Sequence, residues 1–193
     1  MTEVAAKPPD TREFERVVRA GGVVVFPTDT LYGIGCRPDG EEAIERVYEL
    51  KQRPREKPSA VMYFSLAAAL DAHLDLGERT RGALEQLLPG PVLVLLPGGY
   101  GVRVPALTGP PAGADVAVLQ TSANLSGGPD PKRLSDVPES IRAGADLVID
   151  GGELPGVAST VVDLIGYEDG EWEVLREGVI SRTRLEELLR RPC

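Results

Sequence analysis

Seven consecutive residues, 51–57, form a strongly basic run in a chain of formal net charge -9. The run reads Lys-Gln-Arg-Pro-Arg-Glu-Lys, so it holds four cations, one anion and two of the chain's four lysines. Fixed positive charges that lie close together repel one another unless an anion binds between them. The run therefore predicts an anion-binding site. A plainer interpretation stays open, because cations at the C-terminus of a helix are stabilised by the helix dipole without any ligand.

Loops rich in hydroxyl and amide groups are the second set of residues that could do chemistry. They cover residues 28–30, 122–124 and 159–160, and together with two isolated arginines, Arg103 and Arg176, they lie at the ends of predicted strands. Hydroxyl donors and fixed positive charge suit phosphoryl or nucleotidyl transfer, in which a protein positions groups and stabilises charge on phosphate oxygens. Ser and Thr are also common turn formers, so the pattern alone leaves both interpretations open.

Other chemistries find little support in the sequence. Gly33-x-Gly35 lacks the third glycine of a dinucleotide-binding loop, and no P-loop motif occurs. His73 is the only histidine and has ordinary helical spacing, so we expect it to be structural. No residues have the spacing of a tight metal site, so no protein metal ligand is predicted, and Mg²⁺ is expected only in company with a nucleotide. The acidic total charge repels nucleic acid, so direct contact with RNA is expected to be weak and confined to a local patch.

The hydrophobic pattern predicts the elements that position these residues. The length of 193 residues, with 42% hydrophobic and 5% aromatic residues, favours one α/β domain over 11–193 behind a flexible arm over 1–10. There is no basic and apolar leader and no apolar run of about 20 residues, so we expect a cytoplasmic protein without membrane contact. We expect helices over 11–20, 41–51, 66–73, 79–88 and 135–143, and a last helix that begins at a capping box of Thr183 and Glu186. Thr11, Ser65 and Ser135 would cap the first, third and fifth of these helices, and Pro54 would end the second. We expect strands over 23–26, 60–64, 92–96, 101–105, 116–119, 147–150, 159–164 and 172–175.

Six motifs in order resemble the YrdC-like threonylcarbamoyladenylate synthases. They are PTDTLYG at 27–33, LKQRP at 50–54 with KP at 57–58, PGP at 89–91, VRVP at 102–105, SANLSG at 122–127 and STVVD at 159–163. The resemblance extends from about residue 14 to 182. It implies an α/β fold with a twisted sheet of mixed parallel and antiparallel strands, and with flanking helices around a concave basic cavity.

The resemblance also implies an activity, that of a nucleotidyltransferase that uses ATP as a substrate. L-Threonine, bicarbonate and ATP would give threonylcarbamoyl-AMP and pyrophosphate, for the modification of the adenosine next to the tRNA anticodon. Mg²⁺ would arrive with the ATP. A separate tRNA threonylcarbamoyl transferase complex would be a transient partner.

Individual residues take roles by their positions in the motifs. The resemblance implies that Lys51 and Arg53 are catalytic. With Lys57, Ser122, Asn124 and Arg176 they would also bind ATP. Threonine would contact Thr30, Tyr32, Arg103, Gln120 and Thr160, with its carboxylate on the fork of Arg103.

Some positions depart from the pattern of the family. Gln120-Thr121 stands where Ala-Pro is common, Glu177 replaces the proline of Arg-Pro-Gly, and Met62 lies near the expected amino-acid pocket. The segment between Pro105 and Ala117 is shorter and richer in Pro and Gly than the usual helix. These departures concern the side walls of the pocket and leave the phosphate chemistry in place.

Two further functions remain as alternatives. One is an RNA-binding module that uses the same basic surface, which the acidic total charge disfavours. The other is a carbamoyl-transfer domain like those of hydrogenase maturation proteins, which share these motifs. Such domains normally lie within much longer chains, so we expect a stand-alone synthase.

Overall fold

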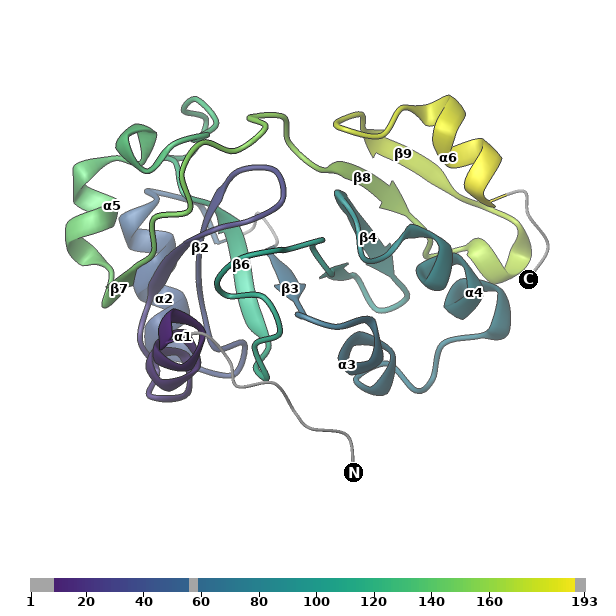
Figure 1. Cartoon of the computed structure of the whole chain (residues 1–193). Coiled ribbons are helices and arrows are strands. Elements are labelled where there is room, and N and C mark those ends of the chain that lie inside the picture. Colours follow the sequence, from purple (N-terminus) through teal and green to yellow (C-terminus); the bar gives the residue numbers. More distant parts are fainter. Residues whose placement is uncertain (1–8, 56–58, 190–193) are drawn as a thin grey trace.

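A single nine-stranded sheet runs through the computed structural model, which describes residues 9–55 and 59–189 (Figure 1). The strand order is β7-β1-β2-β6-β3-β5-β4-β8-β9. The pairs β1–β7, β3–β5 and β4–β8 are parallel and the others antiparallel, so the expected mixed sheet is confirmed. The strands are β1 (Val24–Pro27), β2 (Tyr32–Cys36), β3 (Ala60–Met62), β4 (Val92–Leu96), β5 (Tyr100–Arg103), β6 (Val118–Ser122), β7 (Leu147–Val148), β8 (Thr160–Asp163) and β9 (Glu173–Arg176).

Helices flank the two halves of this sheet (Figure 1). One apolar core joins β4, β5 and β8 to α3, α4 and α6, a second joins β1 and β2 to α2 and α5, and a third lies under α1. None of the described helices is long and apolar enough to cross a membrane. The helices are α1 (Pro9–Arg19), α2 (Glu41–Leu50), α3 (Leu66–Asp71), α4 (Glu78–Leu87), α5 (Glu139–Gly144) and α6 (Arg182–Leu189), with short 3₁₀ turns η1 (Leu134–Asp136) and η2 (Tyr167–Asp169).

Several predicted helix boundaries differ from the structure. The first helix begins at Pro9 rather than behind a Thr11 cap, so at least the last two residues of the expected arm are helical. Helix α2 ends at Leu50, ahead of the expected stop at Pro54, and Lys51 forms its C-cap. The predicted cap at Ser65 is confirmed, because its side chain accepts a hydrogen bond from the backbone N–H of Ala68.

The N-caps predicted for the last two helices, at Ser135 and Thr183, are wrong. Ser135 lies inside η1, and α5 begins only after Pro138. Proline holds the preceding residue in an extended conformation, so one continuous helix cannot pass this point. At α6 the cap is Ser181, whose Oγ accepts from the N–H of Arg184 at 3.3 Å, while Thr183 lies within the helix.

Candidate functional site

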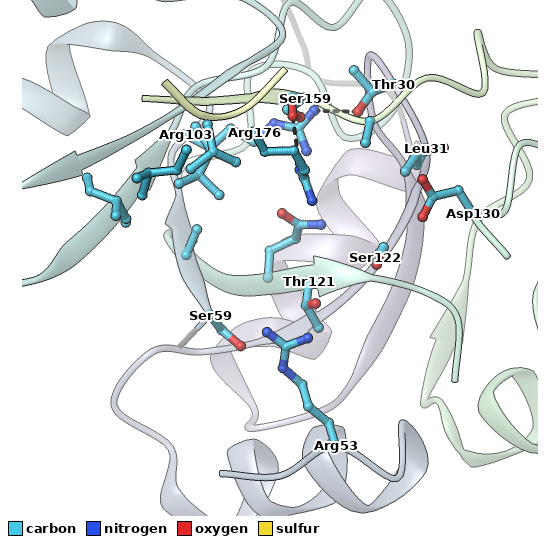
Figure 2. Close-up of a pocket in the computed structure, with 18 residues that line it drawn as sticks. Thr30, Leu31, Arg53, Ser59, Arg103, Thr121, Ser122, Asp130, Ser159 and Arg176 are labelled. Carbon is cyan, nitrogen blue, oxygen red and sulfur yellow. Dashed lines mark hydrogen bonds between the residues drawn. The ribbon is translucent and has the colours of Figure 1, made fainter. Parts of the chain in front are cut away.

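A cavity of about 350 Å³ lies over the centre of the sheet (Figure 2). Its lining comes from β3, β4, β5, β6, β8 and β9 and from the loops around residues 30, 53, 130 and 159. One part is apolar, formed by leucine and valine side chains of β4, β8 and β9. The other part is polar, and it combines three arginines with one carboxylate, Asp130. Six of the predicted site residues line it: Thr30, Arg53, Arg103, Gln120, Ser122 and Arg176.

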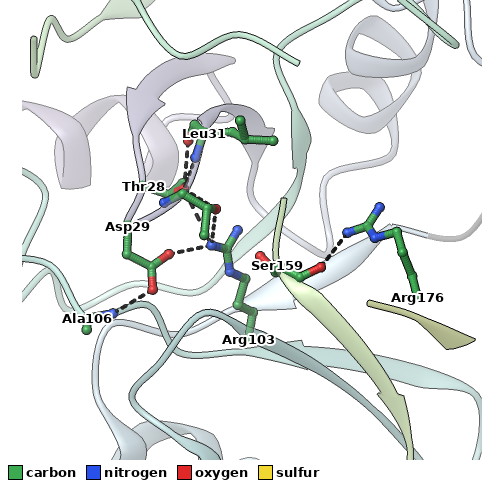
Figure 3. A network of polar contacts seen from close by, with 8 residues as sticks. Thr28, Asp29, Leu31, Arg103, Ala106, Ser159 and Arg176 are labelled. Atoms are coloured by element: carbon green, nitrogen blue, oxygen red, sulfur yellow. Dashed lines mark hydrogen bonds and ion pairs between the residues drawn. The ribbon is translucent and has the colours of Figure 1, made fainter. Parts of the chain in front are cut away.

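Arg103 lies at the centre of a buried polar network (Figure 3). Its Nη2 forms an ion pair with Asp29 and donates to Thr30 Oγ1 at 2.7 Å. The other carboxylate oxygen of Asp29 accepts from the backbone N–H of Ala106 at 3.1 Å. Burial is the largest influence on the pKa of Arg103 and lowers it, while the charge of Asp29 opposes that effect. Nε of Arg103 is buried and has no hydrogen-bond partner among the described residues.

The turn before β2 holds Thr30 beside this arginine. Thr28 Oγ1 donates to the carbonyl of Leu31 at 2.6 Å and accepts from the N–H groups of Thr30 and Leu31, each at 3.2 Å. Thr28 is therefore a turn former, as one of the two sequence interpretations expects. Thr30, in contrast, presents its hydroxyl to Arg103 and to the cavity. The Thr30 hydroxyl also lies 3.2 Å from Thr28 Oγ1. Within one motif the structure thus separates a hydroxyl that forms the turn from one that positions Arg103 at the cavity.

Lys51 is buried, with 1% of its surface exposed, and it does not line the cavity. Its Nζ donates to the carbonyl of Ser122, to the carbonyl of Asn124 at 2.7 Å and to Asn124 Oδ1 at 3.2 Å. Burial, with Arg53 as the second cause, lowers the pKa of Lys51 to about 8. The direct phosphate contact expected of Lys51 stays a prediction, because in this structure its ammonium group donates its hydrogen bonds to protein oxygens.

A left-handed residue separates Lys51 from Arg53. Gln52 has a φ of 49°, and the N–H of Arg53 bonds to the carbonyl of Tyr48 at 2.9 Å. This geometry closes helix α2 in the way that glycine usually does. The chain then leaves the helix, and Arg53 lines the cavity at the same end as Ser59 and Thr121 (Figure 2).

Asn124 belongs to the frame of the loop after β6. Its Oδ1 accepts from Ser122 Oγ at 2.7 Å and its Nδ2 donates to the carbonyl of Gly128 at 2.7 Å. Ser122 lines the cavity, whereas Asn124 is buried beneath it. Together with Lys51 these bonds determine where the Ser122 hydroxyl lies.

Two of the predicted threonine contacts are engaged elsewhere. Thr160 Oγ1 donates to the carbonyl of Ile180 at 2.6 Å and accepts from the N–H groups of Gly178 and Ile180 at 3.1 and 3.0 Å. The hydroxyl of Tyr32 lies 2.9 Å from Asp150 Oδ1 and accepts from the N–H of Gly151 at 2.9 Å, and burial raises its pKa. Neither residue lines the cavity, so their contact with a substrate stays a prediction.

Arg176 lines the cavity on the side of β9, where its Nη2 donates to the carbonyl of Ser159 at 2.9 Å (Figures 2 and 3). Lys57 lies outside the described residues.

Sequence reasoning missed two relevant carboxylates. Asp29 could have been paired with Arg103, because a buried arginine needs a counter-charge. Asp130 carries no comparable signal, because it follows the glycines and proline of an ordinary loop.

The described residues contain no cluster of three or more His, Cys, Asp or Glu side chains suited to a metal ion. Asp130 is the one carboxylate that the described residues contribute to the cavity lining. A metal ion there would therefore take most of its ligands from a bound substrate and from solvent, which is how Mg²⁺ commonly binds beside nucleotides. The donor set thus fits a Mg²⁺ ion carried in by phosphates.

Residues 16–178 match the family model Sua5/YciO/YrdC, described as telomere recombination. The threonylcarbamoyl-AMP synthase of Pyrococcus abyssi is 31% identical over 89% of this chain, which spans only 55% of that protein. The enzyme of the same name from Nitrosococcus oceani is 32% identical over 70% of this chain and 82% of its own length.

Solved structures agree with these sequence matches. P. abyssi Sua5 complexed with L-threonine has a TM-score of 0.79 at 29% identity, over 92% of this chain and 56% of that one. Escherichia coli YciO has a TM-score of 0.76 at 27% identity, over 93% and 95% of the two chains. The expected fold is therefore shared by proteins of about this length and by longer ones.

Proposed function

Because this chain belongs to the Sua5/YciO/YrdC family, we propose that it is a nucleotidyltransferase that makes threonylcarbamoyl-AMP from L-threonine, bicarbonate and ATP. The observation that carries the proposal is the cavity itself. It places a buried arginine with an unpartnered Nε beside two further arginines and a serine hydroxyl. An amino-acid carboxylate and a chain of phosphates need these two kinds of group side by side.

The reaction has two steps. First, the amine of threonine attacks the carbon of bicarbonate, a C–N bond forms, a C–O bond breaks, and the departing hydroxide takes a proton from the amine to leave as water. Second, an oxygen of the resulting carbamate attacks the α-phosphorus of ATP. The new O–P bond replaces the bond to the β-phosphate oxygen, and pyrophosphate leaves with that bonding pair.

At the amino-acid end, Arg103 would bind the carboxylate of threonine. Asp29 and Thr30 occupy its Nη2 and fix its orientation. No described residue engages its Nη1 or Nε, so the N–H groups of these two nitrogens are left for a substrate. Thr30 adds a hydroxyl to the same side. A buried donor without a partner is costly in a folded protein, and a carboxylate oxygen would satisfy it.

At the phosphate end, Arg53, Arg176 and the hydroxyl of Ser122 would bind the phosphates, with Lys57 as a further contact. Negative charge grows on the equatorial oxygens of the α-phosphate as the carbamate attacks. Donors that are already in place stabilise that charge more than they stabilise the ground state. Lys51 and Asn124 would act here through the position of Ser122, and Thr160 and Tyr32 through the loops that they hold.

A Mg²⁺ ion bound with the nucleotide would neutralise phosphate charge, and Asp130 is the residue that would meet it. We further propose that the product passes to a separate tRNA threonylcarbamoyl transferase for the adenosine next to the anticodon, in the cytoplasm. The described sheet and its helices would form the one catalytic domain. Direct binding of tRNA is not required for the reaction.

The test is pyrophosphate release from ATP by the purified chain. We expect release that needs both L-threonine and bicarbonate, together with a product of the mass of threonylcarbamoyl-AMP. Arg103→Ala should lose the stimulation by threonine, and Arg53→Ala should mainly slow turnover. Arg37→Ala is the matched control, because Arg37 pairs with exposed Asp39 outside the cavity. Pyrophosphate release that is indifferent to threonine would refute the proposal.

A further inference from the structure

Gln120 has a carboxamide that faces the cavity and makes no hydrogen bond to a described residue. The residue is 6% exposed and lines the cavity from β6. Among the described residues no hydrogen bond engages its side chain. The cavity reaches this carboxamide and no described residue engages it, so its donor and acceptor are open to a ligand.

The sheet provides the space that this side chain occupies. Gln120 pairs in register with Gly35 on one side and with Ala60 on the other. Gly33 lies on the same face as Gly35, and a Cβ at Gly33 would come within 2.9 Å of Gln120 Nε2. Glycine at position 33 therefore allows the carboxamide to lie where it does.

The register also places Gln120 between the two ends of the proposed site. Ala60 pairs with both Gln120 and Gly101, so these residues lie at one level of the sheet. Arg103 lies two residues beyond that level in one direction, and Ser122 lies two residues beyond it in the other. Two residues of a strand span about 7 Å. A substrate whose carboxylate is on Arg103 and whose reactive end is near Ser122 therefore passes over Gln120.

In the proposed reaction, on which this inference rests, the group between those ends is the carbamate. A carbamate carries an N–H donor next to an oxygen acceptor. A primary carboxamide carries the complementary pair, so Nε2 can donate to one carbamate oxygen while Oε1 accepts from the carbamate N–H. The second carbamate oxygen is then free to attack the α-phosphorus.

We infer that Gln120 binds the carbamate of the carboxylated amino acid and so determines how well the enzyme uses bicarbonate. The C–N bond forms and water leaves as described above, and Gln120 holds the product of that step until its oxygen attacks ATP. The Ala-Pro pair that is common at this position cannot make these side-chain bonds. The role therefore belongs to this chain's own Gln120.

The test is the dependence of pyrophosphate release on each substrate in Gln120→Leu, which removes donor and acceptor but keeps most of the volume. We expect the KM for bicarbonate to rise by about tenfold or more, while the KM for threonine and for ATP change by less than about threefold. Gly33→Ala should produce the same selective rise, because its methyl group displaces the carboxamide. The double variant should be no worse than Gln120→Leu, since both changes remove one interaction.

The outcomes separate this inference from the proposed function. If the unaltered protein shows no threonine-dependent release, the proposed function is wrong. If it does, and Gln120→Leu is folded by circular dichroism with an unchanged KM for bicarbonate, only the inference about Gln120 is wrong. A variant that loses discrimination between threonine and valine, with bicarbonate use unchanged, would assign Gln120 to the substrate hydroxyl and overturn the carbamate contact.

Discussion

Lys51 Nζ donates to both oxygens of Asn124, to the backbone carbonyl at 2.7 Å and to Oδ1 at 3.2 Å. The carbonyl of Ser122 is its third acceptor, so all three N–H donors of the ammonium group are used. The backbone carbonyl of Lys51 also accepts from the N–H of Ser126 at 2.9 Å. The residue at the end of α2 thus holds the loop after β6 through both its side chain and its backbone.

Raising the pH should reduce activity and increase stability through Lys51. Its pKa of about 8 lies below the ordinary 10.5, with burial as the main cause. Above about pH 8 the neutral amine has two donors for three acceptors, so the loop should loosen and pyrophosphate release should fall. Between about pH 8 and 10.5 the unfolded chain binds more protons than the folded chain, so the contribution of this group to the free energy of unfolding rises with pH.

Urea unfolding and pyrophosphate release should be compared at about pH 7 and about pH 9.5, in the unaltered protein and in Lys51→Met. The titration of Lys51 should contribute about 1 to 2 kcal/mol of extra stability at the higher pH. The methionine variant should lack that part of the pH dependence. Identical pH dependences of unfolding in the two proteins would show that Lys51 does not titrate in this range.

Replacing Asp29 by asparagine should destabilise the protein strongly. The side chains of Arg103 and Asp29 are 6% and 9% exposed, so the change leaves a buried guanidinium without its counter-charge. A loss of about 3 to 5 kcal/mol is expected. Asp39→Asn is the control in an exposed pair with Arg37, where solvent screens the charges, and it should change stability far less. Chemical denaturation measures both, and similar losses would contradict the buried role of Asp29.

Gln52 should tolerate glycine better than valine. Its φ of 49° is a left-handed conformation that glycine adopts without strain and that a β-branched residue resists. We expect Gln52→Gly to be neutral or to stabilise by up to about 1 kcal/mol, and Gln52→Val to destabilise by about 1 to 2 kcal/mol. Glu49→Gly, within α2, should instead lose about 1 kcal/mol. Thermal midpoints decide the order, and a stabilising valine would contradict it.

The hydroxyl of Thr160 should matter more than its methyl group. Thr160→Val leaves the N–H groups of Gly178 and Ile180 without their acceptor and should cost about 1 to 3 kcal/mol. Thr160→Ser keeps the acceptor and should retain most of the stability and activity. Unfolding curves measure the first effect and pyrophosphate release the second. Equal losses in the two variants would instead assign the effect to packing of the methyl group.

Elements with strong local patterns could be predicted from sequence. Strand β4 has the predicted bounds, because its apolar run lies between Pro91 and Pro97. Ser65 caps α3 as expected. The pairing of β6 between β2 and β3 could not be predicted in the same way, because it depends on contacts between residues far apart in the chain.

In the candidate site, too, the sequence predicted some features and not those that depend on distant contacts. The motifs identified Thr30 and Thr160 as equivalent hydroxyls, yet one lines the cavity and the other holds a loop. The direction in which a turn or strand residue faces depends on contacts with segments far away in the chain, and the local sequence does not contain that information. Lys51 is buried while Arg53 lines the cavity because Gln52 between them has a left-handed conformation. A glycine at position 52 would have predicted this conformation from the sequence, whereas a glutamine does not.

The order of the strands has a consequence for the protein's synthesis. A nascent chain that has reached residue 150 already contains Arg53, Arg103 and Ser122, but it lacks β8, the parallel partner of β4. The apolar edge of β4 therefore stays open for pairing with other chains until β8 has been made. Completion of β8 and β9 closes that edge and, in the same event, brings Arg176 to the cavity. In this order of synthesis Arg176 is the last of the cavity arginines named above to be put in place.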